Sequence, residues 1–191
     1  MLRFKEVLAG CLKNDNKSKE VVYKSFYGYL MGVVFRYVSD RNDAEELVND
    51  SFIKIFKNLS QFAHPRDEDA LTKAFKGWIA KISSRTAIDF IRSRRALVYM
   101  DDFTEAEQPI TEWNALTKLN VQDILRLLNG LPELHRLVFN LYEIEGYAHD
   151  EIAKLLSIPE SSSRVYLTRA KQKLRVLYSN TSVGTYGTEL I

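Results

Sequence analysis

Cysteine, proline and glycine are all scarce in this chain of 191 residues. It holds one Cys, 4 Pro and 8 Gly. The lone Cys11 excludes an intramolecular disulfide and a cysteine-based zinc site, and it favours a reducing cytoplasm as the compartment. Too many charges precede Cys11 for a secretory signal, and the longest apolar-rich stretch, 29–35, is far shorter than the ~20 residues that span a bilayer. We therefore expect no membrane insertion.

The chain also lacks a large excess of positive over negative residues, or of negative over positive. The sequence has 27 Lys+Arg against 25 Asp+Glu, a net charge of +2, and 46% hydrophobic residues. These values exclude global disorder and a wholly basic tail protein. The charges are nevertheless sorted along the chain. Residues 73–95 hold seven cations and one acid, residues 161–175 hold five cations and no acid, and residues 40–50 and 100–112 each hold five acids.

Apolar residues recur at steps of three and four along most of the chain, which predicts an all-α protein. The expected helices span 19–37, 43–59, 70–95, 114–129, 132–145, 149–156 and 160–178. Residues 100–112 have few side chains that could bury a face, so we interpret them as a flexible acidic linker. The predicted organisation is two small helical domains, 1–99 and 113–178, joined by the linker 100–112 and followed by a loose tail, 179–191.

The stretch 146–174 has the pattern of a helix-turn-helix. A short helix with Ile152 and Leu156 facing inward meets a turn at Ser157, and a second, basic helix follows. Such a second helix enters the major groove of DNA in proteins of this kind. Basic helices neutralise backbone phosphates, although a charge run alone is more often a solvated surface. Two basic helices in separate domains favour nucleic-acid binding.

Three motifs in this order resemble the extracytoplasmic-function (ECF) subfamily of bacterial sigma factors. They are the acidic helix 43–52, the basic segment 75–95, and Gly130 to Phe139 followed by the helix-turn-helix. The resemblance covers about residues 20–178. It implies that 1–99 is the region two domain, which binds the polymerase clamp and melts the minus-ten element. It implies that 113–178 is the region four domain, which reads the minus-thirty-five element.

Under this resemblance the chain is a sigma factor that binds core RNA polymerase and promoter DNA, with an anti-sigma protein as a further potential partner. The expected polymerase contacts are Asp43, Glu46, Asn49 and Asp50. The expected minus-ten contacts are Lys76, Lys81, Ser84, Arg85, Asp89, Arg92, Arg94 and Arg95, with Trp78 in the core. The expected minus-thirty-five contacts are Ser161, Ser162, Arg164, Tyr166, Arg169 and Lys173.

Two of the departures from the family pattern lie at the ends of the first helix of the helix-turn-helix. Ala148 stands where a hydroxyl cap is usual, so that the cap is lost or passes to Asp150. Ser157 stands where the turn usually has Gly, which tolerates a left-handed conformation better than Ser.

The sequence also bears on two other classes of protein. An enzyme is disfavoured because the three His residues are scattered and no phosphate loop, nucleophile elbow or metal-ligand spacing occurs. We therefore expect no catalysis, no cofactor and no metal. The alternative is a helix-turn-helix transcription regulator with an N-terminal sensor or dimerisation domain. The many cations of residues 73–95 argue against that alternative, since a sensor domain does not need them.

Overall fold

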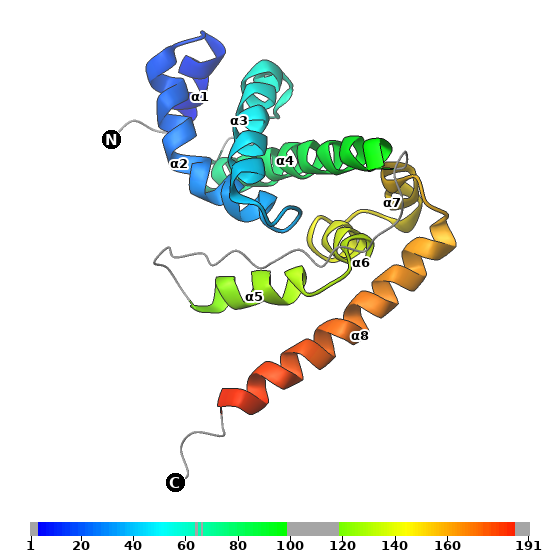
Figure 1. Ribbon diagram of the computed structural model, residues 1–191. Helices are drawn as coiled ribbons and strands as arrows, with labels where there is room; N and C mark the ends of the chain where they lie inside the picture. Colours follow the sequence, from blue (N-terminus) through cyan, green and yellow to red (C-terminus); the bar gives the residue numbers. More distant parts are fainter. Residues whose placement is uncertain (1–3, 64, 66, 99–118, 186–191) are drawn as a thin grey trace. The chain divides into compact units, whose positions relative to one another are not determined.

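The computed structural model of the protein describes residues 4–63, 65, 67–98 and 119–185 (Figure 1). Every regular element in these ranges is a helix, so the predicted all-α class is confirmed. The chain divides into two compact units, Met1–Asp102 and Phe103–Ile191, and the division falls within the predicted linker. The linker itself, residues 100–112, lies outside the described residues. No described helix has both the length and the apolar character that crossing a membrane would require.

The described residues of unit 1 form four α-helices and one short 3-10 turn. They are α1 (Phe4–Leu12), α2 (Asn16–Val34), α3 (Arg41–Asn58), the 3-10 turn η1 (Leu59–Gln61) and α4 (Glu68–Val98). Aspartates start two of the helices, because a carboxylate at the cap accepts hydrogen bonds from otherwise unpaired N–H groups. Asp15 accepts from the N–H of Ser18 at 2.9 Å, and Asp40 accepts from the N–H of Asn42 at 2.8 Å. These caps fix where α2 and α3 begin.

The core of unit 1 is built around Phe75 of α4, which is fully buried. The rings of Phe4, Phe26 and Phe62 lie 5.2–5.4 Å from it, measured between centroids. Trp78 packs on the same cluster, 5.9 Å from Phe75, which supports the expectation that it belongs to the core. Burying an aromatic ring of this size stabilises a fold by about 1.5–3 kcal/mol. The cluster therefore anchors α4 against α1, α2 and η1.

Unit 2 contains the helix-turn-helix. Its elements are α5 (Leu119–Asn129), α6 (Glu133–Phe139), the π-helical turn η2 (Asn140–Ile144), α7 (His149–Leu156) and α8 (Glu160–Thr185). Leu128, Leu131 and Ala170 form a buried cluster between α5 and α8. Ser157 has φ 54° and ψ 45°, the left-handed conformation that ends α7, and its N–H donates to the carbonyl of Ala153. This turn sends the chain from α7 into the basic helix α8.

Two elements differ from the expectation. Helix α1 was not predicted, although it buries Val7, Leu8 and Cys11. Gly10 lets it approach α2 closely, because a Cβ at this position would lie 2.1 Å from the Oγ of Ser18. Helix α8 runs to Thr185, beyond the predicted end at residue 178, so part of the expected loose tail is helical. Residues 186–191 of that tail lie outside the described residues.

Candidate polymerase and nucleic-acid interfaces

The acidic face of α3 presents three of the four predicted polymerase contacts to solvent. Glu46, Asn49 and Asp50 are exposed. Ile53 lies seven residues after Glu46, on the same face of the helix, and 65% of it is exposed. An exposed Ile among acids adds apolar area to this surface, and no charge pattern in the sequence points to it. We define the α3 face as Glu46, Asn49, Asp50 and Ile53.

Asp43 has a different environment from these residues. Its carboxylate accepts a hydrogen bond from the guanidinium of Arg94 at 2.6 Å, and only 24% of its side chain is exposed. This ion pair joins α3 to α4. Asp43 and Arg94 were predicted to contact two different partners, the polymerase and DNA, but the structure pairs them with each other.

A narrow strip of charge follows the exposed side of α4. Lys81, Arg85, Asp89 and Arg92 are all exposed, and their spacing of three, four and seven residues places them on one face. Three cations and one acid give this strip a net positive charge. Backbone phosphates are the natural partners of such a strip, since Lys and Arg release the counterions that phosphates hold. We define the α4 strip as these four residues.

The other predicted minus-ten residues lie elsewhere on α4. Ser84 is fully buried and its hydroxyl donates to the carbonyl of Lys81 at 3.2 Å, so its side chain does not reach the exposed side of α4 where the DNA contact was expected. Lys76 lies with its ammonium 5.7 Å from the ring centroid of Tyr29, away from the α4 strip. The side chain of Arg95 lies outside the described residues.

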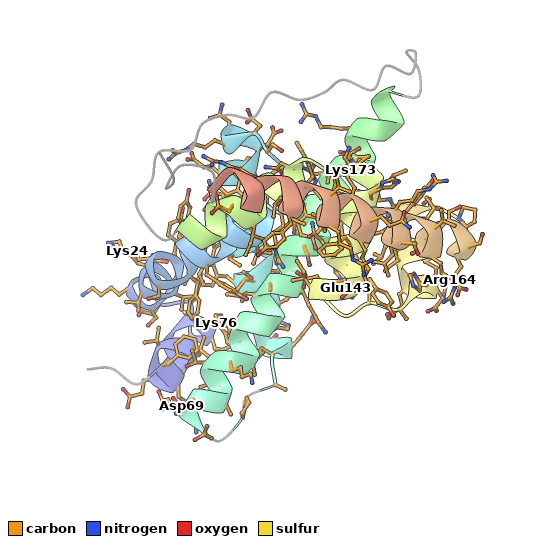
Figure 2. All side chains as sticks on the ribbon, turned by 90° about the horizontal axis from the view of Figure 1, so that it is seen from below. Lys24, Asp69, Lys76, Glu143, Arg164 and Lys173 are labelled. Carbon is orange, nitrogen blue, oxygen red and sulfur yellow. The ribbon has the colours of Figure 1, made fainter. Side chains whose placement is uncertain are left out.

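Helix α8 presents a second cationic surface. Ser161, Arg164, Arg169 and Lys173 are exposed, and Ser162 is half-buried. Figure 2 shows Arg164 near the start of α8 and Lys173 farther along the same helix. The guanidinium of Arg164 lies 2.6 Å from the carboxylate of Glu160, one helical turn earlier. The same exposed side carries residues that the sequence analysis did not single out: Val165, Thr168 and Gln172.

Tyr166 was predicted to face DNA, and in the structure its ring is engaged within unit 2. Its ring is half-buried and packs against His135 of α6, with 5.2 Å between the centroids. Burial, together with the nearby charges of Arg169 and Lys173, lowers the pKa of His135 below its usual value. Tyr166 therefore helps to hold α8 on α6.

His149 joins the helix-turn-helix at the start of α7. Its ring stacks on Tyr142 of η2 with 4.5 Å between centroids, and its Nδ1 lies 2.9 Å from the hydroxyl of the buried Ser163 in α8. Burial is the main cause that lowers the pKa of His149, and Arg164 adds to it. One side chain thus connects η2, α7 and α8.

The cap of α7 is supplied by a residue that was not expected. Glu151 accepts a hydrogen bond from the N–H of Ala148 at 2.8 Å, which is half of a capping box. The carboxylate of Asp150, named as the substitute cap, instead lies 3.3 Å from the ammonium of Lys154. The loss of a hydroxyl at Ala148 is therefore partly compensated from within the helix.

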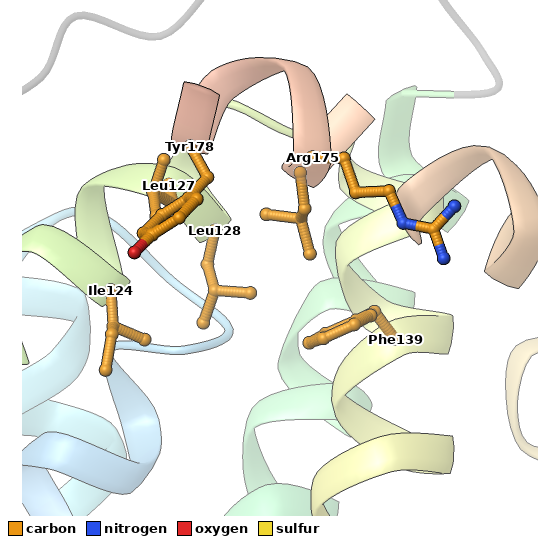
Figure 3. A pocket seen from close by; sticks show the side chains of 7 residues that line it. Ile124, Leu127, Leu128, Phe139, Arg175 and Tyr178 are labelled. Atoms are coloured by element: carbon orange, nitrogen blue, oxygen red, sulfur yellow. The ribbon is translucent and has the colours of Figure 1, made fainter. Parts of the chain in front are cut away.

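An apolar hollow of about 320 Å³ opens between α5, α6 and α8 (Figure 3). The residues that line it are Ile124, Leu127, Leu128, Phe139, Leu174, Arg175 and Tyr178. Apart from Arg175 and the hydroxyl of Tyr178, the lining is apolar. Among the described residues no group of three or more His, Cys, Asp or Glu could hold a metal ion.

Family models match both units. The model described as Sigma-70 region 2 matches residues 22–97, and the model described as Sigma-70, region 4 matches residues 121–174. Together they cover well over half of the chain. The chain belongs to the sigma-70 family. The region 2 match contains the α3 face and the α4 strip, and the region 4 match contains the helix-turn-helix. A sensor or dimerisation domain in unit 1 is thereby excluded.

Curated relatives confirm the resemblance to the ECF subfamily of sigma factors. An ECF RNA polymerase sigma-E factor of Haemophilus influenzae is 24% identical over 174 residues, which are 85% of this chain and 88% of that protein. The ECF RNA polymerase sigma factor SigE of Mycolicibacterium smegmatis is 26% identical over 75% of this chain. The matched part is 54% of that relative, so the chain spans about half of its length.

A solved structure has a similar fold. It is the sigma factor RpoE of Bartonella quintana, in complex with the anti-sigma factor NepR. The TM-score is 0.50 at 19% identity, with 84% of this sigma-70 family chain and 96% of the other chain covered. The arrangement of helices in this chain therefore has a counterpart among known sigma factors.

Proposed function

We propose that this chain binds core RNA polymerase and directs it to promoters, where unit 1 melts and reads the minus-ten element and unit 2 reads the minus-thirty-five element. The observation that carries the proposal is the separation of charge between helices of two sigma-family regions. The α3 face is acidic and partly apolar, whereas the α4 strip and the exposed side of α8 are cationic. A protein that bridges polymerase and DNA needs two surfaces of this kind.

The α3 face is the proposed polymerase surface. Glu46 and Asp50 supply charge for a basic partner, and Ile53 supplies apolar area that becomes buried on binding. Asp43 supports this surface indirectly, because its ion pair with Arg94 joins the start of α3 to α4.

The α4 strip and α8 are the proposed DNA surfaces. Lys81, Arg85 and Arg92 neutralise phosphates next to the melted strand, and Asp89 accepts from a base that leaves the stack. Melting requires a few kcal/mol of unstacking, which contacts to the single strand offset. On α8, Arg164 and Arg169 reach base edges or phosphates in the major groove.

Under this proposal the protein itself catalyses no reaction. It acts in the cytoplasm, without cofactor or metal, by positioning polymerase. An anti-sigma protein is a further proposed partner, and the Bartonella quintana relative, which was solved in complex with NepR, supports this.

Transcription with purified core polymerase tests the proposal. The full chain is mixed with core polymerase and genomic DNA of the host, and the 5′ ends of the transcripts are mapped. We expect start sites that share two upstream elements and that are missing without the chain. The double variant Glu46→Lys, Asp50→Lys should abolish co-purification with core polymerase and keep the helical circular dichroism spectrum. Absence of new start sites, together with retained co-purification of the double variant, would contradict the proposal.

A further inference from the structure

Asn49 is the only amide among the predicted polymerase contacts, and it does not act alone. Its Oδ1 accepts a hydrogen bond from the hydroxyl of Tyr23 on α2, at 2.9 Å. The neighbouring residues of the α3 face, Glu46 and Asp50, offer only carboxylate oxygens. The pair of Tyr23 and Asn49 thus adds a feature that the acidic character of α3 does not explain.

The ring of Tyr23 is held in place by packing. Its centroid lies 4.6 Å from that of Phe52, which is buried in α3, and 5.4 Å from that of Tyr27, one turn away on α2. Tyr23 itself is half-buried. Because the ring cannot swing freely, its hydroxyl defines where the amide oxygen of Asn49 lies.

The structure places the oxygen end of the Asn49 amide on the hydroxyl of Tyr23, which leaves the NH₂ end for a partner. An Asn side chain has an acceptor oxygen and an NH₂ group with two donors. The hydroxyl of Tyr23 engages the oxygen of Asn49, whereas the exposed NH₂ group has no hydrogen-bond partner among the described residues. The group that best complements Asn49 is therefore an acceptor, such as a carbonyl or a carboxylate.

We propose that Tyr23 is a positioning residue for the polymerase contact of Asn49, and that the polymerase presents a hydrogen-bond acceptor opposite the Asn49 amide. This inference rests on the proposed function of the α3 face. It predicts a mixed interface, in which carboxylates of α3 bind cations and one amide binds an acceptor. A purely electrostatic interface would have no need of the hydroxyl of Tyr23.

The variant Asn49→Asp tests the acceptor. Asp keeps the size of Asn and the oxygen that accepts from Tyr23, but it replaces both donors by a charged acceptor. We expect the affinity for core polymerase to fall at least tenfold, measured by competition with labelled wild-type chain. If the partner group is instead a cation, the affinity rises, and that result would overturn the proposal.

The variant Asn49→Ala separates this inference from the proposed function. It removes both ends of the amide, so its affinity for core polymerase falls if position 49 lies in the interface. If Asn49→Ala binds like the wild type while Glu46→Lys, Asp50→Lys does not, the α3 face stands and the role of Asn49 is wrong. If none of these variants loses affinity, the proposed polymerase surface itself is wrong.

The variant Tyr23→Phe tests the positioning role by removing a single oxygen atom. We expect a loss of affinity of about two- to tenfold, the range that one hydrogen bond contributes, and at most a small fall in melting temperature, because this exposed bond also links α2 to α3. Tyr27→Phe is the matched control, since it makes the same change on the adjacent ring, and it should bind like the wild type. In the Asn49→Ala background, Tyr23→Phe should cause no further loss.

Two outcomes would overturn the role of Tyr23. One is a Tyr23→Phe variant with wild-type affinity while Asn49→Ala binds weakly. The other is an equal loss in the Asn49→Ala background, accompanied by a large fall in melting temperature, which would show that the hydroxyl stabilises unit 1 in general.

Discussion

Replacing Ser157 by Gly should stabilise the helix-turn-helix unit. Ser157 has φ 54° and ψ 45°, and its N–H donates to the carbonyl of Ala153, so it ends α7 in the left-handed conformation. This conformation costs an L-residue about 1–2 kcal/mol, whereas Gly adopts it without that penalty. Gly loses more chain entropy on folding, about 0.5–1 kcal/mol, which offsets part of the gain. The expected net stabilisation is about 0.5–1 kcal/mol.

The change is measurable as a melting temperature of unit 2. For a domain of this size, 1 kcal/mol corresponds to a shift of about 4–8 °C, so we expect a rise of about 2–8 °C by calorimetry. Hydrogen exchange of the amides in α7 and α8 assigns the gain to unit 2. Ser161→Gly is the matched control, because Ser161 lies in the first turn of helix α8, where Gly should destabilise by at most about 0.5 kcal/mol. A Ser157→Gly variant that melts no higher than the wild type would refute the reasoning.

Three further predictions concern packing, pH and DNA. Gly10→Ala should destabilise unit 1 by about 1–3 kcal/mol in denaturant unfolding, because the new Cβ would lie 2.8 Å from the Cβ of Ser18; a neutral effect would mean that α1 does not pack as described. The pKa values of His135 and His149 are lowered in the folded state. As the pH falls below about 6.5, the usual pKa of His, the unfolded state therefore binds more protons than the folded state. The melting temperature of unit 2 should therefore fall as the pH drops below about 6.5, and replacing both His residues by Gln should flatten this dependence. Arg164→Ala should weaken binding to a mapped promoter duplex by about 1–3 kcal/mol and leave unrelated duplexes unaffected, whereas an equal loss on all duplexes would indicate a phosphate contact.

The class of fold and the family could be predicted from the sequence because both depend on patterns that repeat over many residues. Apolar spacing identified α2, α3, α4, α7 and α8, and the order of three motifs identified the family. Helix α1 was not predicted because it is short and its apolar positions span barely two turns. Isolated patterns of that length do not distinguish a helix from a loop.

The individual side chains were harder to predict because a charge or an aromatic ring in a sequence carries no direction. Ser84 was assigned to the DNA side of α4 because its spacing from Arg85 and Asp89 suggested a shared helical face. In the structure α4 packs against α1, α2 and α3, so small residues on several sides are buried. Tyr166 was assigned to DNA because it lies in a basic helix. Its ring instead packs against His135 of α6, a residue distant in sequence.

The burial of α4 limits how the promoter preference of this protein can evolve. Between Lys81 and Arg92 only the four residues of the α4 strip are exposed, and every other position packs partly or wholly inside unit 1. A substitution at a buried position changes the stability of the fold before it changes which bases are read. Under the proposed function of the α4 strip, variants with a new minus-ten preference should therefore collect at Lys81, Arg85, Asp89 and Arg92. Randomising these four positions would give a small library of variants. Such a library could be screened for a sigma factor that does not use the promoters of related sigma factors.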